Sequence, residues 1–313
     1  MDFKELFDKK LLIVSGKGGV GKTTVSLLLA HLASQSGKKT LLVEMNNAQR
    51  TGIFFGLKKV PYKEKEVLEN LFITSIQAPN TFEEYILDQI HSKTIYSLIF
   101  ENRYVRNFLD ATPGLSELLQ IGKVWALTER DLDKEKKHKY DLVILDAPAT
   151  GHGLALLNVA QVVIRAIKMG PLYNQASRIV KLLQDPLKTQ LIVTALAEEM
   201  PINEALEMLR QARLKLKLNC GPVILNGIFP RFLSDEEWEV TRRELNTLES
   251  TEELGRVVLF YQERVLLQKT YKEKLLHELE GHPCWELPFL FQDAGTLKGI
   301  KQLATCLRDE SLT

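Results

Sequence analysis

The feature that most constrains the fold is a glycine-rich segment, SGKGGVGKTT, at Ser15 to Thr24. It lies between a short apolar run, Leu11 to Val14, and a run with helical character, Val25 to Ser34. A strand, a glycine-rich turn and a helix in this order form a phosphate-binding loop when the turn reads G-x-x-x-x-G-K-[ST]. The segment fits that pattern, so the sequence predicts a nucleotide-binding α/β domain.

The residue types in this loop suit phosphate chemistry. Glycines adopt backbone angles closed to other residues, so successive N–H groups can turn towards an anion. The helix beginning near Lys22 directs its positive dipole end at the same place. Lys22 would contact the β- and γ-phosphates, and the Thr23 hydroxyl would bind Mg²⁺. The predicted nucleotide-binding residues of the loop are Gly16, Lys17, Gly18, Gly19, Val20, Gly21, Lys22, Thr23 and Thr24.

A second candidate site residue is Asp146, which ends the apolar run Leu142 to Leu145 and begins the segment DAPATGH. An acidic residue at the carboxyl end of a buried strand lies where ligands bind in open α/β sheets. We therefore expect Asp146 to hold Mg²⁺ through a water molecule, as a Walker-B carboxylate does. The alternative is that Asp146 only caps the following turn.

Short apolar runs separated by longer amphipathic runs predict a doubly wound, mostly parallel α/β sheet. The expected strands are Leu11–Val14, Thr40–Glu44, Leu71–Ser75, Asp141–Asp146, Gln190–Thr194 and Pro222–Asn226. The connection from Ser75 to Asp141 is far longer than one crossover helix requires. We expect a single domain of residues 1–313 with a helical insertion at 78–139, beside which residues 151–188 pack.

The bulk composition excludes several classes of protein. The net charge of +1 gives no field that would attract nucleic acid, and 45% apolar with 26% charged residues is ordinary for a globular domain. The N-terminal MDFKELFDKK has no apolar run, so we expect no signal peptide there, and the apolar stretch Leu154 to Ile164 is too short to span a bilayer. Cys220, Cys284 and Cys306 lie far apart, which predicts no zinc site. We expect a cytoplasmic protein without stable membrane insertion.

Two motifs carry a resemblance to a known family. The loop GKGGVGKTT has an extra lysine, Lys17, and DAPATGH places Thr150, Gly151 and His152 after Asp146. Together they resemble the deviant Walker A ATPases that include the arsenite-pump and tail-anchored-protein targeting ATPases, with the alanine and proline of the second motif exchanged in order. The chain resembles a bacterial-like, single-half member. The resemblance implies a homodimeric ATPase in which Lys17 reaches the partner's ATP, and in which hydrolysis moves a helical subdomain that holds an apolar protein client.

Two weaker matches extend the resemblance. The run Val223 to Asn226 resembles the family's adenine-reading strand end, where the Asn226 amide would contact the base edge. The segment Trp285 to Leu290 resembles the family's later loop, in which Pro288 and Phe289 would pack on the adenine face. Without the two stronger motifs, Asn226 and Pro288 are ordinary turn residues.

The chain departs from the family where the second strand ends. The family's D-P-A-H aspartate, which orients the attacking water, is replaced by Asn46 in the segment Glu44 to Arg50. An amide can position water but cannot accept its proton, and Glu44 lies two residues earlier on the same strand face. Glu44 could therefore act as the acid or hold a Mg²⁺-bound water, and we expect slow hydrolysis. The predicted catalytic residues are Lys17, Lys22, Glu44, Asn46 and Asp146.

Two other functions remain open: a nucleotide-gated binding protein that hardly hydrolyses ATP, and a partitioning or positioning ATPase. A positioning ATPase would gain from a basic amphipathic helix that binds a membrane, and the mixed charges of Lys298 to Thr313 argue against such a helix. Arsenite transport is not expected, because the cysteines are near neither the DAPATGH motif nor the segment Glu44 to Arg50. Apolar residues in Tyr85–Leu98 and Ile99–Leu118 could line a client groove, or they could pack the core.

Overall fold

The structure, a computed structural model, describes residues 3–45, 50–78, 80–84, 114–129, 139–148, 150–247 and 253–310. Asn46 and most of the predicted insertion, including nearly all of the candidate client groove, lie outside these residues. The predicted extent of the insertion stays a prediction.

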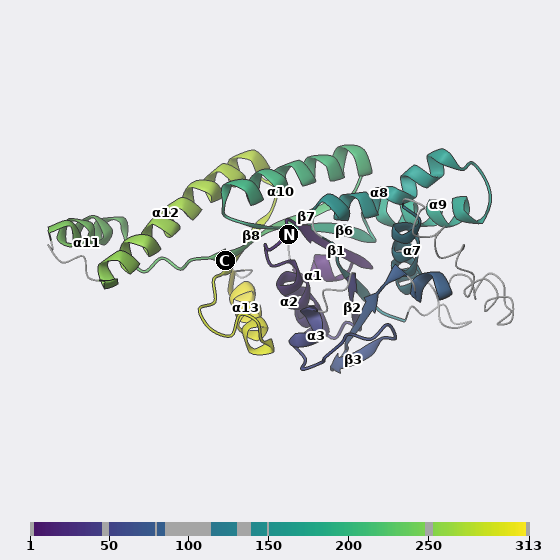
Figure 1. Ribbon diagram of the computed structural model, residues 1–313, viewed down its shortest axis with the longest axis horizontal. Coiled ribbons are helices and arrows are strands. Elements are labelled where there is room, and N and C mark those ends of the chain that lie inside the picture. Colours follow the sequence, from purple (N-terminus) through teal and green to yellow (C-terminus); the bar gives the residue numbers. More distant parts are fainter. Residues whose placement is uncertain are drawn as a thin grey trace.

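The described residues form a sheet of eight strands in the order β3-β4-β2-β5-β1-β6-β7-β8 (Figure 1). All neighbouring strands are parallel except β3 and β4, which are antiparallel. The predicted doubly wound, mostly parallel fold is therefore confirmed. The strand bounds are β1 Leu11–Gly16, β2 Thr40–Met45, β3 Lys65–Leu68, β4 Leu71–Ile76, β5 Leu142–Asp146, β6 Thr189–Leu196, β7 Cys220–Ile228 and β8 Cys284–Pro288.

The central strands are apolar on both faces because helices cover both faces. Alternate residues of β1 belong to opposite cores: Leu11 and Ile13 pack on one side, and Leu12 and Val14 on the other. The first side is covered by α7 (Leu115–Glu129), α8 (Thr150–Ala166), α9 (Pro171–Gln184), α10 (Glu199–Gln211) and the end of α12 (Glu253–Leu279). The second is covered by α2 (Lys22–Gln35) and α13 (Leu297–Glu310).

The strand register decides which polar side chains meet at the carboxyl edge. Val14 of β1 and Glu44 of β2 are both paired with Asp146 of β5. Because the three strands are parallel and adjacent, their carboxyl ends come together beside the turn that links β1 to α2. This register brings Glu44 and Asp146 to one edge of the sheet.

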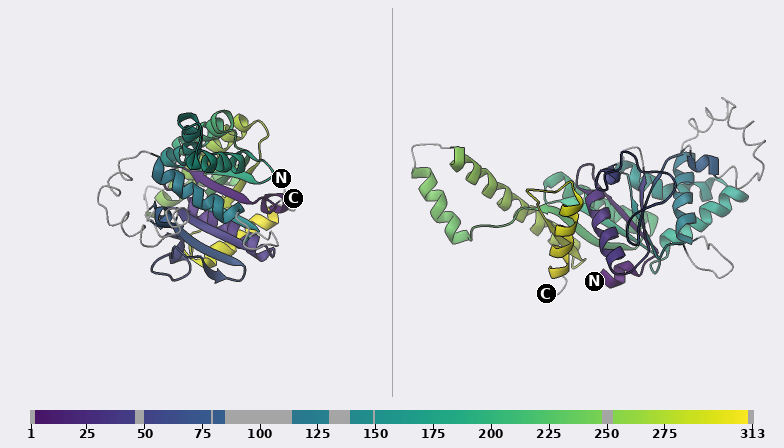
Figure 2. Two further views of the ribbon diagram at one scale, coloured as in Figure 1. Left: turned by 90° about the vertical axis from the view of Figure 1, so that its right-hand side faces the viewer. Right: turned by 90° about the horizontal axis from the view of Figure 1, so that it is seen from below.

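Helical elements extend the molecule on two sides of the sheet. On one side α7 packs against α8 and α9. On the opposite side α11 (Asp235–Thr247) and α12 project as an arm, which is visible in Figure 1 and in the right view of Figure 2. The shorter elements are α1 Phe3–Phe7, α3 Arg50–Ile53 and the π-helix η1 Ala212–Leu216. Among the described helices, none combines the length and apolarity needed to cross a bilayer.

His282 connects η1 to the start of β8 and makes folding stability depend on pH. Arg213 Nη2 donates to His282 Nδ1 at 2.9 Å, so the ring's other nitrogen, Nε2, donates to the Gly221 carbonyl at 2.6 Å. The ring is therefore neutral in this arrangement. Burial lowers the pKa of His282.

We expect His282 to make the protein less stable in mild acid. Because its folded-state pKa is lowered, its contribution is full above the ordinary histidine pKa of about 6.5 and is lost as pH falls below that value. Denaturant unfolding at pH 7.5 and pH 5.5 measures this loss, which should be smaller in His282→Gln. An equal pH dependence in the variant and the wild type would contradict the assignment.

Candidate nucleotide-binding site

A cavity of about 740 Å³ lies at the carboxyl ends of β1, β2 and β5. Its wall combines the glycine-rich turn with polar side chains from the neighbouring strands and a segment before α13. The lining residues include Gly18, Gly19, Gly21, Lys22, Thr23, Thr24, Glu44, Met45, Arg50, Phe54, Asp146, Pro148, Ala294 and Gly295. The structure thus gathers into one cavity the loop, Glu44 and Asp146, which the sequence places far apart.

The turn between β1 and α2 needs glycine at two positions for different reasons. Gly16 has φ +155°, and a Cβ built on it would lie 2.2 Å from the Thr194 carbonyl oxygen. Gly21 precedes α2 with φ +91°, and a Cβ there would lie 2.1 Å from Asn226 Nδ2. Both side-chain-free positions let the loop pass close to β6 and β7.

Lys22 folds back over the loop. Its Nζ donates to the Lys17 carbonyl oxygen at 2.8 Å. Burial lowers the pKa of Lys22, and the carboxylate of Asp146 opposes that effect. The ammonium is thus held at the cavity wall by a neutral carbonyl, and a phosphate oxygen would be a stronger partner for it.

Asp146 and Thr23 are in direct contact. Thr23 Oγ1 donates to Asp146 Oδ2 at 2.7 Å, and Ser26 Oγ donates to Oδ1 at 3.3 Å. Burial raises the pKa of Asp146, which is 7% exposed, and the Thr23 hydroxyl and Lys22 charge work against that rise. One hydroxyl and one carboxylate oxygen at the cavity form the hard donor set that Mg²⁺ takes. The residues present therefore fit the predicted ion.

Ser26 was not predicted from the sequence. It lies three residues after Thr23 on α2, a spacing that puts both hydroxyls on the same helix face. This spacing is the sequence feature from which the contact of Ser26 with Asp146 could have been predicted. Ser26 donates to the carboxylate oxygen of Asp146 that Thr23 does not contact.

Glu44 lies beside Asp146 and is 2% exposed. Its Oε1 accepts a hydrogen bond from the Arg50 backbone N–H at 2.8 Å. Its Oε2 is buried and has no hydrogen-bond partner among the described residues. Burial raises the pKa of Glu44. Of the two residues considered for orienting water, Glu44 is the one that the structure places at the cavity.

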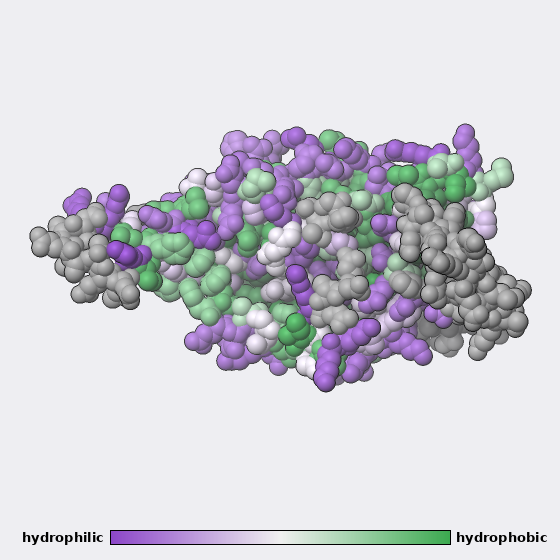
Figure 3. Space-filling model, viewed as in Figure 1, coloured by the Kyte–Doolittle hydropathy of each residue, from purple (hydrophilic) through white to green (hydrophobic). Residues whose placement is uncertain are grey.

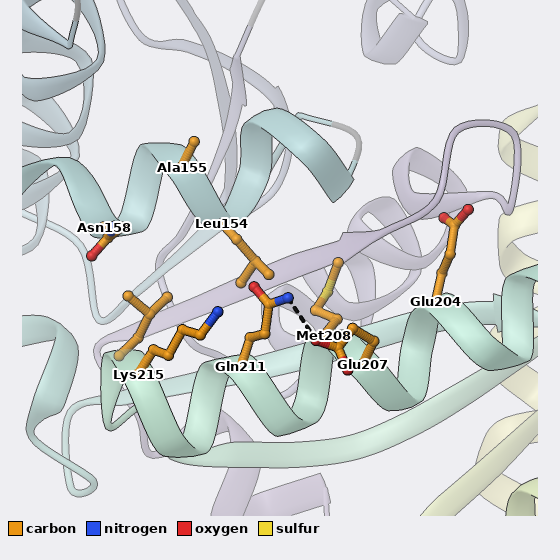
Figure 4. A pocket seen from close by; sticks show the side chains of 9 residues that line it. Leu154, Ala155, Asn158, Glu204, Glu207, Met208, Gln211 and Lys215 are labelled. Carbon is orange, nitrogen blue, oxygen red and sulfur yellow. Dashed lines mark hydrogen bonds between the residues drawn. The ribbon is translucent and has the colours of Figure 1, made fainter.

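Lys17 is held by its own chain. Its Nζ forms an ion pair with Glu204 Oε1 of α10 at 2.9 Å, with both side chains about one-third exposed. Lys17 does not line the nucleotide cavity. Glu204 also stands at one end of a second cavity of about 480 Å³ between α8 and α10, where Leu154 and Met208 supply apolar wall (Figure 4).

The three residues predicted to contact adenine are placed differently from one another. Asn226 Nδ2 donates to the Val20 carbonyl at 3.0 Å, so Asn226 touches the loop. Pro288 ends the strand β8, a strand where the sequence suggested a loop, and neither Pro288 nor Phe289 lines the cavity. Ala294 and Gly295, a few residues later, do so instead.

Phe289 belongs to an aromatic cluster, which consists of Phe229, Phe232, Tyr261, Phe289 and Phe291. The Phe289 and Phe229 rings are stacked, with centroids 4.5 Å apart and planes 8° from parallel. Hydrophobic residues colour the surface between the arm and α13 in Figure 3, and Phe232 and Phe291 are 69% and 60% exposed. The cluster lies just beyond the carboxyl ends of β7 and β8, since Phe229 directly follows β7 and Phe289 directly follows β8.

The DAPATGH motif that begins at Asp146 lies only in part within the described residues. Helix α8 begins at Thr150, directly after the segment that leaves β5. Ala149 lies outside the described residues, as do the side chains of Thr150 and His152. The backbone of the Thr-Gly-His segment therefore forms the first turn of α8, which packs against α10.

Comparison with known proteins extends these observations. The family model for the anion-transporting ATPase matches residues 9–181, which include the loop, Glu44 and Asp146. The ATPase BagA of Mycobacterium tuberculosis is 32% identical over 236 residues, which are 73% of this chain and 68% of that protein. The ATPase get3 of Schizosaccharomyces japonicus is 32% identical over 179 residues, 54% of this chain and 52% of that protein. An ATPase ASNA1 homolog of Plasmodium yoelii yoelii is 24% identical over 275 residues, 77% and 68% of the two chains.

Proposed function

This chain belongs to the family of anion-transporting ATPases, and we propose that it binds ATP with Mg²⁺ and hydrolyses it slowly. The observation that carries the proposal is the convergence of Lys22, Thr23 and Asp146 on one cavity with the glycine-rich turn. Loop N–H groups and the Lys22 ammonium would neutralise the phosphates. Thr23, and Asp146 through water, would hold Mg²⁺, which would screen the charge of the triphosphate.

The base of the nucleotide would lie on the β7 side of the loop. Asn226 supports this proposal, because its amide already touches the loop at Val20. An amide can donate to and accept from a base edge once it leaves that carbonyl. Pro288 and Phe289 would reach the adenine face if the segment between β8 and α13 moved towards the loop.

Glu44 is our proposed residue for orienting the attacking water, together with Asn46. A carboxylate whose pKa is raised by burial is a better proton acceptor near neutral pH. Phosphoryl transfer through a loose transition state depends more on position and charge than on proton abstraction. Loss of the family's aspartate at Asn46 should therefore slow hydrolysis without abolishing it.

The test is phosphate release from ATP by the purified protein, with Mg²⁺ or with EDTA, alongside calorimetric binding of Mg·ATP. We expect binding, and Mg²⁺-dependent turnover below about 1 s⁻¹, under the usual range of enzymes. Binding without phosphate release, with a large gain in Asn46→Asp, would instead favour a nucleotide-gated binding protein. Nucleotide-dependent sedimentation with liposomes would favour the positioning type. No binding of ATP would overturn the proposal.

We further propose a cytoplasmic homodimer in which Lys17 of each chain serves the other chain's ATP. A cation supplied in trans neutralises developing phosphate charge only when two chains meet. The helices around residues 78–139 and 151–188 would then form the part of the single domain that holds an apolar protein client. No zinc site is required, because the segment after Asn226 reads Phe229-Pro230-Arg231-Phe232 without cysteine.

The ion pair between Lys17 and Glu204 should oppose this dimer. Glu204→Gln would release Lys17. An ion pair of this exposure stabilises its own arrangement by up to about 1 kcal/mol, which is about fivefold in an equilibrium constant. Because two such pairs break in each dimer, we expect the variant with Mg·ATP to dimerise at about two- to thirtyfold lower concentration in sedimentation equilibrium.

Glu207→Gln is the matched control, because Glu207 stands on the same helix and accepts a hydrogen bond from Gln211 rather than binding Lys17. Equal dimerisation of Glu204→Gln, Glu207→Gln and wild type would remove the proposed restraint. Unchanged dimerisation of Lys17→Ala would remove the trans role of Lys17.

A further inference from the structure

Arg50 lines the nucleotide cavity, and its side chain has no role in the site described so far. It is the first residue of α3, its side chain is exposed, and it lines the cavity together with Lys22 and Asp146. Within the described part of the chain its guanidinium makes no hydrogen bond or ion pair. A fork of donors thus lies at the wall of the cavity that the proposed substrate would fill.

The electrostatics of the cavity show that Arg50 is close to the phosphate-binding groups. Besides the dominant effect of burial, the Arg50 charge further lowers the pKa of Lys22, and it also works to lower the pKa of Asp146. Two cations that repel each other across one cavity are both stabilised when an anion lies between them.

The strand order indicates which part of a nucleotide would approach Arg50. Asn226 on β7 lies on one side of the loop, and Asp146 on β5 and Glu44 on β2 lie on the other. A triphosphate that crosses the loop from β7 would therefore end beside β5 and β2. Arg50 follows β2, at that far end.

The backbone of Arg50 is anchored where such a contact would need it. Its N–H donates to Glu44 Oε1 at 2.8 Å, and Glu44 is buried beside Asp146. The anchor leaves the side chain free to bend into the cavity while its Cα stays fixed. Less conformational entropy is lost on contact when the backbone is already placed.

We propose that Arg50 binds the terminal phosphate of ATP in its own chain and makes the site prefer ATP to ADP. The inference rests on the proposed ATPase function. A guanidinium presents paired N–H donors that match two phosphate oxygens, and it stays charged at every physiological pH. On this geometry a cation in cis reaches the γ-phosphate before any partner chain supplies Lys17.

The test compares Arg50→Ala and Arg50→Lys with wild type in calorimetric binding of Mg·ADP and of a non-hydrolysable ATP analogue with Mg²⁺. Arg50→Ala should weaken binding of the ATP analogue by about ten- to a hundredfold, the range for a hydrogen bond to a charged group. Binding of ADP should change by less than about twofold, because ADP lacks the group that Arg50 contacts. Arg50→Lys, which keeps the charge and loses the fork, should be intermediate.

Arg242→Ala is the control, because Arg242 lies on the projecting helix α11 and pairs with Glu239. Wild-type protein that binds neither nucleotide would refute the ATPase function itself. Wild-type protein that prefers ATP, with the same preference in both Arg50 variants, would overturn the inference about Arg50 alone. Equal loss of ATP and ADP binding in Arg50→Lys would also overturn it. If Arg50→Ala does not fold, Arg50→Lys decides the question.

Discussion

Lys22→Ala is expected to lower ATP turnover by about a hundred- to a thousandfold. The ammonium is part of the cavity wall and is held there by the Lys17 carbonyl, so it is already placed for a phosphate. Removal of one preorganised donor to developing charge costs about 2.7–4 kcal/mol in other enzymes, which corresponds to that loss of rate. Initial rates of phosphate release at saturating Mg·ATP measure it.

The matched control for this prediction is Lys38→Ala. Lys38 pairs with Asp8 on the surface, where loss of an ion pair changes stability little. The control should keep wild-type turnover, and thermal melting should show that both variants fold. Turnover by Lys22→Ala above a tenth of the wild-type rate, or on the order of the control, would contradict the role of Lys22.

Gly16→Ala is expected to destabilise the protein and to abolish nucleotide binding. The new Cβ would lie 2.2 Å from the Thr194 carbonyl oxygen, and this atom belongs to the backbone of a buried strand and cannot rotate away. Overpacking of this kind costs about 1–3 kcal/mol, and the positive φ of Gly16 adds strain for any other residue. The loop would have to shift away from β6. Denaturant unfolding and calorimetric titration with Mg·ATP measure the two effects.

Gly37→Ala separates the clash from the backbone strain. Gly37 also has a positive φ, +84°, but a Cβ there would meet no atom within 4 Å. It should lose only the about 1–2 kcal/mol of left-handed strain and should bind Mg·ATP as wild type does. If Gly16→Ala were no less stable than Gly37→Ala and bound nucleotide equally well, the close passage of the loop past β6 would not matter for function.

Most of the fold could be predicted because its central strands are encoded locally. Short, continuously apolar runs such as those of β1 and β5 are typical of central strands that are buried between two layers of helices. β3 and β8 were missed for the opposite reason. β3 carries two exposed charged residues at the sheet edge, and β8 is only half-buried and ends in a proline. Their pairing is imposed by neighbouring strands.

The parts of the site that were predicted depend on short-range patterns. Lys22 and Thr23 follow from the loop sequence itself, and Asp146 follows from its place at the end of an apolar run. The contacts of Lys17 with Glu204 and of Asn226 with Val20 join residues that are distant in the sequence. No local pattern encodes such partners, because they depend on how α10 packs on the sheet and on the place of β7 two strands from β1.

The amino-acid order alone therefore determined the kind of ligand, since a turn rich in glycine and ending in lysine and threonine has backbone donors and a cation suited to a polyphosphate. Which side chains face that ligand was decided only when the sheet assembled. Parallel register set Glu44 next to Asp146, and the position of α3 placed Arg50 at the cavity wall. The physical reason is that a hydrogen bond or ion pair requires atoms within a few ångströms, and tertiary packing alone brings distant segments that close.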